Sequence, residues 1–226
     1  SFTSEQFAKI WMHAGMITIN GEKMSKSVGN VKSINHVLES WGPNVVRLFC
    51  ISGHYSKPID YTEDLLKENL IKLRQIETCY YELRLADKTE ELEDISSLVK
   101  ESREKFDAAL NDDFNTSLGL SVFFNMVKTI NSLASDEKIS KNISEQALPV
   151  LEYMLEVLGL KVQTVSDDEI KSIFDLIDKR EKLRDEKKFE EADKIRDQIA
   201  SLGISLIDHK NKTLWMKKEA IKAEKQ

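Results

Sequence analysis

Apolar residues recur at intervals of three and four along most of this chain, and that spacing is typical of amphipathic helices. A long helix is predicted to begin after Thr62, whose hydroxyl can cap it, while Glu63 and Asp64 suit the positive end of the helix dipole. Its apolar stripe consists of Leu66, Leu70, Leu73, Ile76, Tyr80 and Leu83. One face of this helix is therefore expected to lie in a core.

Three further amphipathic helices are predicted downstream of it. The apolar positions of the first two are Leu98, Val99, Phe106, Ala109 and Leu110, and then Val122, Phe123, Met126, Val127, Ile130 and Leu133. The third runs roughly from Ser144 to Leu158 and ends at Gly159, a residue suited to a left-handed cap. Four amphipathic helices with short connections predict a helical bundle over residues 61–165.

Residues 166–226 are predicted to form a small α/β module. Ser166 and Glu169 have the spacing of a capping box, which fixes the start of a helix that runs to about Lys187. A second helix, 189–202, is followed by two β-prone runs, 204–207 and 213–216, that indicate a hairpin. The last ten residues are rich in Lys and Glu and are expected to be frayed.

Residues 1–60 combine short elements of both kinds. The run Met16–Ile19 is β-prone, and Asn20-Gly21 after it is a strong turn signal. Ser33 can cap a helix that Gly42-Pro43 interrupts, and a very apolar helix is expected over 44–51. The pattern as a whole predicts a mainly α protein with a small α/β part, divided at about residues 60 and 165.

Composition narrows the classes of protein that fit this pattern. The 226 residues include only 8 Gly and 3 Pro, too few for the many turns of a sandwich or barrel. No apolar run is long enough to span a membrane and the N-terminus lacks a signal-peptide layout, so a cytoplasmic protein is expected. Cys50 and Cys79 alone can form neither a disulfide framework nor a zinc site, and both are interpreted as packing residues.

The net charge of −6 conceals three different segments. Residues 61–165 hold 20 acidic and 12 basic side chains, whereas the segments before and after carry +2 and 0. An acidic total argues against a nucleic-acid partner only if it is evenly spread. Here the acidity belongs to the predicted bundle, so the two flanking segments remain candidates for binding polyanions.

The candidate chemistry lies in residues 21–30, Gly-Glu-Lys-Met-Ser-Lys-Ser-Val-Gly-Asn. Lys23 and Lys26, interleaved with hydroxyls and flanked by glycines, make a cationic loop that suits a phosphate group. Generic loops of this composition are usually solvated turns. A given pentapeptide, however, is expected by chance in a chain this long only about once in 10⁴ proteins, so Lys23–Ser27 is a specific signal.

The pentapeptide Lys23-Met24-Ser25-Lys26-Ser27 is the signature loop of class I aminoacyl-tRNA synthetases, and the surrounding sequence resembles cysteinyl-tRNA synthetase. The similar stretches are Phe7–His13, Arg47–Phe49, Ser52–Tyr55, Asp60–Tyr61 and Asp112–Thr116. The resemblance continues to Trp215 and so covers nearly the whole chain. It implies activation of cysteine by ATP with Mg²⁺, followed by transfer of the cysteinyl group to tRNA-Cys.

The resemblance assigns a role to each residue of the loop. Lys23 and Lys26 would be catalytic, because they stabilise charge that develops on the β,γ-phosphates of ATP. Ser25 and Ser27 would add hydrogen bonds to the phosphates, while Met24 would anchor the loop by packing. Gly29 would allow the loop to move.

Much of the family's pattern is missing from this chain. The nucleotide-binding motif and the zinc ligands are expected before Ser1, so no metal is assigned to this chain and Zn²⁺ belongs to the complete enzyme. We therefore interpret the chain as a C-terminal portion of a synthetase, monomeric and without a membrane partner. It is expected to be inactive alone.

The resemblance also places an anticodon-binding surface in residues 166–226. The run from Lys179 to Arg196 holds eight basic residues among many acids, which in a generic sequence indicates an exposed helix with ion pairs. By position in the family, tRNA contacts are expected from Arg184, Phe189, Asp193, Arg196, Asp208 and Trp215. The arginines and acids would read base edges or phosphates, and the two aromatic rings would stack on bases.

Three alternatives remain open at this point. The related ligase that joins cysteine to an amino sugar in mycothiol synthesis shares the catalytic part but needs no anticodon module. Another class I synthetase fits Ser52-Gly53-His54-Tyr55 less well. A stand-alone tRNA-binding module, without catalysis, would have no use for the loop at residues 23–27.

Overall fold

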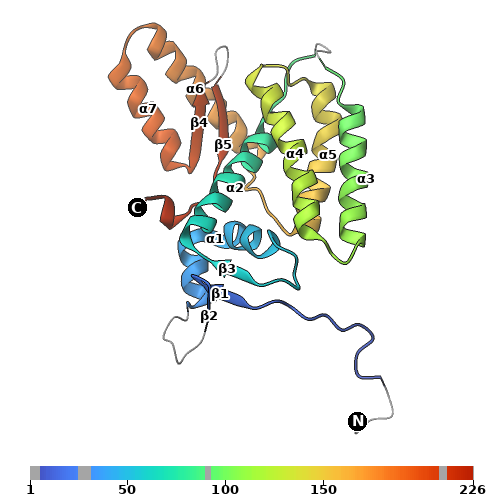
Figure 1. Cartoon of the computed structure of the whole chain (residues 1–226). Coiled ribbons are helices and arrows are strands. Elements are labelled where there is room, and N and C mark those ends of the chain that lie inside the picture. Colours follow the sequence, from blue (N-terminus) through green and yellow to red (C-terminus); the bar gives the residue numbers. More distant parts are fainter. Residues whose placement is uncertain (1–5, 25–31, 90–92, 209–212, 226) are drawn as a thin grey trace.

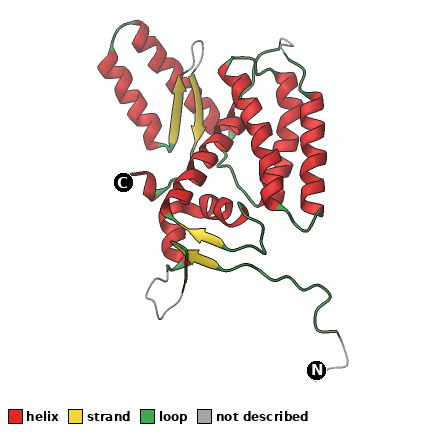
Figure 2. Ribbon diagram, in the orientation of Figure 1, coloured by secondary structure: helices red, strands yellow, loops and turns green. Residues whose placement is uncertain are grey.

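The computed structural model describes residues 6–24, 32–89, 93–208 and 213–225. Three groups of elements follow one another along the chain, and Figure 1 shows them around the long helix α2 (Glu63–Arg84). A small sheet with α1 (Ile34–Ile51) lies at one end, the other helices of the bundle lie beside α2, and a helix pair with a β-hairpin lies on its other side. Helices dominate and strands are few (Figure 2), so the predicted mainly α fold with a small α/β part is confirmed.

The N-terminal part is built on a three-stranded sheet. Strands β1 (Ile17–Ile19), β2 (Glu22–Lys23) and β3 (Ile59–Tyr61) lie in the order β2-β1-β3. The β1–β2 pair is antiparallel and the β1–β3 pair is parallel. The predicted turn joins β1 to β2, with left-handed φ angles of 50° at Asn20 and 78° at Gly21.

Helix α1 (Ile34–Ile51) contains the predicted interruption. Gly42 has a φ of 74°, and a Cβ added there would lie 2.3 Å from Glu219 Oε1, so both the backbone and the space require glycine. Pro43 then opens the second half of the helix. Ser33 precedes α1 as expected, but its side chain makes no capping hydrogen bond, which corrects that detail.

The bundle consists of α2 (Glu63–Arg84), α3 (Ser96–Asn111), α4 (Thr116–Ser135) and α5 (Lys141–Leu158). Thr62 caps α2 as predicted, since its Oγ1 accepts a hydrogen bond from the Leu65 amide at 3.2 Å. Helix α5 begins three residues before the predicted Ser144, because Ser140 caps it by accepting from the Ile143 amide. Gly159 ends α5 with a φ of 69°, the predicted left-handed cap.

The C-terminal part pairs two helices with a hairpin. Helices α6 (Asp167–Asp185) and α7 (Phe189–Ser201) lie against each other, and strands β4 (Ile204–Asp208) and β5 (Thr213–Lys217) form an antiparallel pair. The capping box is present, with reciprocal hydrogen bonds between Ser166 and Glu169. Strand β5 contacts α2, which brings this part against the bundle (Figure 1).

The C-terminal tail is docked, which corrects the expectation that the last ten residues are frayed. A short 3₁₀ helix, η1 (Lys222–Lys225), contacts α1, and Ile221 before it is only 2% exposed. Glu219 is also buried. The tail is polar in composition, but the burial of Ile221 and Glu219 and the contact of η1 with α1 place it against the rest of the molecule.

Two further observations bear on the sequence-based expectations. Cys79 is buried and packs in the core, as expected, but Cys50 is exposed, so its interpretation as a packing residue is wrong. It lies at the solvent-facing edge of α1, whose other face carries the apolar contacts. Among the described residues, no helix has the length and apolar character needed to cross a membrane.

Candidate functional site

The hairpin formed by β1 and β2 leads directly into the cationic loop. Lys23 is exposed and is the last residue of β2, and Met24 after it is half-buried. The other loop residues to which the resemblance assigned roles lie outside the described residues: Ser25, Lys26, Ser27 and Gly29. The structure therefore describes how the chain enters the loop, through a strand pair that holds its first lysine.

Asp60 on β3 attaches this hairpin to the rest of the sheet. Its Oδ1 accepts a hydrogen bond from Thr18 Oγ1 at 2.6 Å and a second from the backbone amide of Gly21 at 2.9 Å. These two hydrogen bonds, that from Thr18 above all, hold the pKa of the Asp60 carboxyl below its ordinary value. Sequence reasoning noted Asp60 only as part of the resemblance and gave it no role.

The strand register places three polar side chains on one face of the sheet. Thr18 is the direct neighbour of Lys23 on β2 and of Asp60 on β3. Because directly opposite residues in a sheet project to the same side, Lys23, Thr18 and Asp60 form a row across the three strands.

Helices α6 and α7 bring together four of the six residues expected to bind the anticodon. Phe189, Asp193 and Arg196 are exposed and lie four and three residues apart, which puts them on one face of α7. Phe189 is 60% exposed, so its ring is available for stacking. Arg184 is exposed near the end of α6, just before the turn that leads to Phe189.

The other two residues of that set are placed differently. Asp208 ends β4 next to Thr213 in the register, and its side chain lies outside the described part. Trp215 is completely buried in β5, so it presents no face to a base, and the expected stacking role is corrected to a packing role. The sequence pattern did not predict the burial of Trp215, because a short hairpin strand can turn either face inward.

Trp215 fills the junction between the C-terminal part and the bundle. Its ring centroid lies 5.3 Å from that of Tyr81 on α2 and 6.1 Å from that of Phe174 on α6. Tyr81 in turn donates from its hydroxyl to the backbone oxygen of Gln163 at 2.6 Å, and burial raises its pKa to about 12. Aromatic packing therefore fixes the module against α2.

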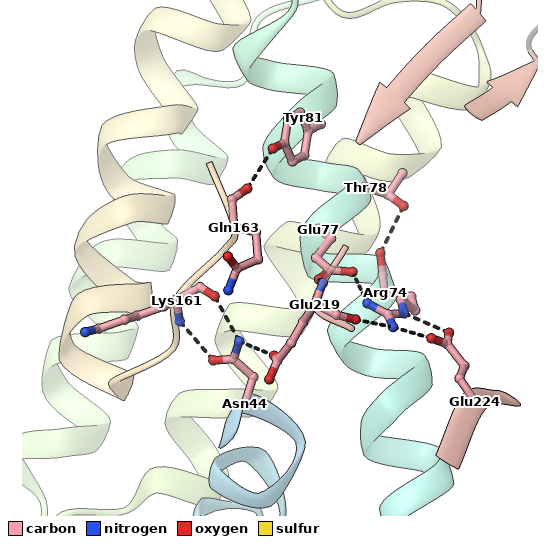
Figure 3. Close-up of polar contacts among 9 residues, drawn as sticks. All are labelled: Asn44, Arg74, Glu77, Thr78, Tyr81, Lys161, Gln163, Glu219 and Glu224. Atoms are coloured by element: carbon pink, nitrogen blue, oxygen red, sulfur yellow. Dashed lines mark hydrogen bonds and ion pairs between the residues drawn. The ribbon is translucent and has the colours of Figure 1, made fainter. Parts of the chain in front are cut away.

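A buried polar network below this junction was missed from the sequence (Figure 3). Arg74 on α2 donates to Glu77 at 2.7 Å, and the Glu77 side chain is only 1% exposed. The other Glu77 oxygen accepts from the Glu219 amide at 3.0 Å, while Arg74 also donates to the Glu219 carbonyl at 3.0 Å. Arg74 pairs with Glu224 of η1 as well, so the tail is bound at two points.

The same network reaches α1 through Asn44. Its Nδ2 donates to Glu219 Oε2 at 2.6 Å and to the Lys161 carbonyl at 2.9 Å, and its Oδ1 accepts from the Lys161 amide at 3.0 Å (Figure 3). Burial raises the pKa of Glu77 even though Arg74 and the Glu219 amide favour its ionised form. The network ties α1, α2, the segment after α5 and the C-terminal tail to one another.

A second contact connects the end of α1 to the turn between α3 and α4. Tyr55 donates from its hydroxyl to Asp113 Oδ1 at 2.8 Å, and His54 Nε2 lies 3.1 Å from the Asp113 carbonyl oxygen. Asp113 and Phe114 both have left-handed φ angles, 51° and 52°. Two of the stretches that carry the family resemblance, Ser52–Tyr55 and Asp112–Thr116, are thus in contact and position each other.

Among the described residues, no group of three or more His, Cys, Asp or Glu side chains is arranged to hold a metal ion. The described residues therefore supply no donor set that could be assigned to zinc.

Comparison with known families agrees with this arrangement. Residues 1–70 match the model of the tRNA synthetases class I (C) catalytic domain, and residues 105–163 match the DALR domain. The first match covers the small sheet, α1 and the start of α2, and the second covers the C-terminal part of α3 together with α4 and α5.

Relatives extend the similarity over most of the chain. A cysteine–tRNA ligase of Caldicellulosiruptor saccharolyticus is 35% identical over 91% of this chain and 45% of its own length. Those of Finegoldia magna and Thermococcus onnurineus are 37% and 36% identical, each over 94% of this chain. The chain is homologous to cysteine–tRNA ligases. The resemblance drawn from the sequence is confirmed, and the chain spans about half the length of the curated relatives it matches.

One solved structure resembles part of this fold. It is the agnB2 LeuRS of Agrobacterium radiobacter K84 in a ternary complex with tRNA and LeuAMS, with a TM-score of 0.52. The similarity covers 63% of this chain and 20% of that protein, at 19% sequence identity. A likeness at this identity concerns the fold.

Proposed function

We propose that this chain is part of a cysteine–tRNA ligase and supplies its signature loop and its tRNA-binding surface. The observation that carries the proposal is the position of Lys23–Ser27, which begins at the last residue of the β1–β2 hairpin, in the segment that matches a class I synthetase catalytic domain. The complete protein would activate cysteine with ATP and transfer it to tRNA-Cys. Residues 1–60, 61–165 and 166–226 would form the end of the catalytic part, the bundle and the anticodon module.

The chemistry proposed for the loop is electrostatic. Lys23 and Lys26 would stabilise negative charge on the β,γ-phosphates as pyrophosphate leaves, and the hydroxyls of Ser25 and Ser27 would donate to phosphate oxygens. No proton transfer by these lysines is required, since an ammonium group stabilises charge without giving up a proton. Mg²⁺ would accompany ATP, and Zn²⁺ would be bound outside this chain.

The proposed tRNA surface is the exposed face of α7 with the end of α6. Phe189 offers a ring for stacking, Arg196 and Arg184 offer planar donors, and Asp193 offers acceptors for base amino groups. Asp208 at the end of β4 is proposed as a further contact. Trp215 supports this surface from within the core.

The first test is cysteine-dependent exchange of pyrophosphate into ATP, measured on the complete protein as a monomer. Lys26→Ala should reduce the exchange rate by about 10²-fold or more, because a preorganised charge is lost from the transition state. Lys100→Ala, an exposed lysine on α3, is the matched control and should leave the rate unchanged. Activation of another amino acid in place of cysteine would refute the proposal. Pyrophosphate exchange by this chain alone would refute the prediction that it is inactive by itself.

The second test is binding of this chain to the tRNA-Cys transcript and to a transcript with an altered anticodon. Arg196→Ala and Asp208→Ala should weaken binding to the first and reduce discrimination between the two. Lys171→Ala, at an exposed lysine near the start of α6, removes one positive charge, as Arg196→Ala does, but away from the proposed surface, and it should have little effect. Equal affinity of the unsubstituted chain for both transcripts would show that the anticodon is not read.

A further inference from the structure

The signature loop is entered through a hairpin that has little support of its own. Strand β2 consists of two residues, both exposed, and β1 consists of only three residues. Short two-stranded hairpins are only marginally stable in water. The turn at Asn20 and Gly21 is exposed, and a Cβ added at Gly21 would meet nothing within 4 Å. Something outside the hairpin must therefore fix the direction in which it leads the chain.

Asp60 is placed to do this. Asp60 lies about 40 residues from the turn in sequence. One of its carboxylate oxygens nevertheless accepts hydrogen bonds from the Thr18 hydroxyl, before the turn, and from the Gly21 amide, within the turn. Strand β3, which carries Asp60, continues directly into Thr62, the N-cap of the long helix α2. In addition to the backbone pairing of β1 with β3, this side chain therefore connects the turn of the hairpin to the strand that leads into α2.

We propose that Asp60 is a positioning residue for the signature loop, because its two hydrogen bonds hold the Asn20–Gly21 turn and so direct Lys23 toward the phosphates. Lys23 and Asp60 lie on the same face of the sheet, separated by Thr18. The catalytic part of this inference, that the loop acts on phosphates, rests on the proposed function. The structural part, that Asp60 orders the hairpin, is independent of it.

Substitutions at Asp60 can separate hydrogen bonding from charge. Since one oxygen accepts both bonds, the amide oxygen of Asn can take its place, and Asp60→Asn should keep the turn while removing the negative charge. Asp60→Ala removes both bonds. Glu22→Ala is the matched control, because Glu22 is an exposed carboxylate of the same hairpin on the opposite face.

The first readout is hydrogen exchange of the backbone amides of residues 17–24, measured on this chain. Asp60→Ala should speed exchange in this segment about tenfold, while Asp60→Asn and Glu22→Ala should leave it near that of the unsubstituted chain. Unchanged exchange in Asp60→Ala would overturn the inference without reference to any enzyme activity. Global unfolding would be recognised by equal acceleration in α2, and Thr18→Val, which removes one bond only, then serves as the milder variant.

The second readout is adenylate formation by the complete protein. Asp60→Ala should lower kcat about tenfold and leave the KM for cysteine unchanged, and Asp60→Asn should restore kcat to within about threefold. If Asp60→Asn is as impaired as Asp60→Ala, the charge and not the hydrogen bonding matters, and the positioning role is refuted. If the unsubstituted protein forms no adenylate but Asp60→Ala still speeds hydrogen exchange of residues 17–24, the proposed function fails. Asp60 then remains a structural anchor of the hairpin.

Discussion

At the scale of single residues, aromatic side chains of the C-terminal part divide into those that hold it and those that are free to bind. Trp215 is 0% exposed between Tyr81 and Phe174, whereas Phe189 is 60% exposed on α7. Phe189 stands between Lys188 and Glu190, whereas Trp215 stands between Leu214 and Met216, so the local sequence favours burial of Trp215 but does not say what covers it. Long-range packing decides which ring is buried.

We predict opposite effects for these two rings. Trp215→Ala should lower the free energy of unfolding by about 3–5 kcal/mol, because it leaves a large cavity at the junction with α2. Phe189→Ala should leave stability nearly unchanged and weaken tRNA binding by about tenfold, the loss of one base stack. Chemical denaturation and tRNA binding measured on both variants check this. A stable Trp215→Ala variant with impaired tRNA binding would restore the stacking role to Trp215.

The buried Arg74–Glu77 pair gives a second prediction at this scale. Arg74→Met should destabilise the fold by about 3 kcal/mol, because it leaves the Glu77 carboxylate buried without its cation. Glu77→Gln should cost only about 1 kcal/mol, since the amide can still accept from the Glu219 amide and Arg74 keeps Glu224. Denaturation midpoints at pH 7 compare the two.

The pH dependence of Arg74→Met is a control on that explanation. Burial already raises the pKa of Glu77, and loss of Arg74 should raise it further. A raised carboxyl pKa in the folded state means that stability is present at low pH and lost as pH rises through that pKa. The variant should therefore regain stability relative to the unsubstituted protein between pH 7 and about pH 5. A constant difference would argue against a buried charge.

At the scale of elements, the sequence predicted best where a local signal fixes an end of a helix or a turn. Thr62, Ser166 and Gly159 are caps whose hydrogen bonds or φ angles involve only neighbouring residues, and Asn20-Gly21 is a turn of the same local kind. The docked tail and the exposure of Cys50 were not predicted, because each depends on which remote surface packs against it.

The capping box at the start of α6 can be tested through its pH dependence. Ser166→Ala should cost about 1 kcal/mol at pH 7, since it removes the side-chain acceptor for the Glu169 amide. The pKa of Glu169 is lowered, chiefly by the hydrogen bond from the Ser166 amide. A carboxyl group whose pKa is lowered by folding stabilises the folded state at pH values above its pKa in the unfolded chain, about 4.3. This stabilisation is lost as the pH falls through the pKa of the folded state.

The unsubstituted protein and the Ser166→Ala variant are therefore both expected to lose stability when the pH drops below about 4, because Glu169 is then protonated. Thermal melts at pH 7 and pH 3.5 measure it. Glu169→Gln is the matched variant, because it keeps an acceptor for the Ser166 amide but has no charge to titrate. If that variant shows the same acid sensitivity as the unsubstituted protein, Glu169 is not the group responsible.

The C-terminal tail gives a further prediction. A chain that ends at Glu219 loses Ile221, which is 2% exposed, and the Glu224 partner of Arg74. We expect the free energy of unfolding to fall by about 2 kcal/mol, mostly from the lost burial of Ile221. Lys222→Ala, an exposed position of η1, should change it little. An unchanged melting temperature after truncation would show that the tail is not held as described.

At the scale of the whole molecule, the candidate site was predicted only in part. The role of Lys23–Ser27 followed from an uncommon pentapeptide, and the four exposed residues of α6 and α7 followed from the resemblance. Asp60 and the network around Arg74 were not found, because the contacts that define them are remote in sequence: Gly21 lies 39 residues from Asp60, and Glu224 lies 150 residues from Arg74. A side chain whose function is to connect distant segments leaves no periodic pattern in the sequence.

The hydrogen bond between Asn44 and Glu219 joins residues 175 positions apart, and it has a consequence for the order of events during synthesis. Helices α1 and α2 leave the ribosome long before residue 219, and they can pack with Glu77 already enclosed. Until residues 219–224 emerge, that carboxylate lacks the Glu219 amide, and Arg74 lacks two of its acceptors. The nascent chain therefore gains this stabilisation only after residue 224 has been synthesised, so products truncated before residue 219 would be the ones most readily degraded.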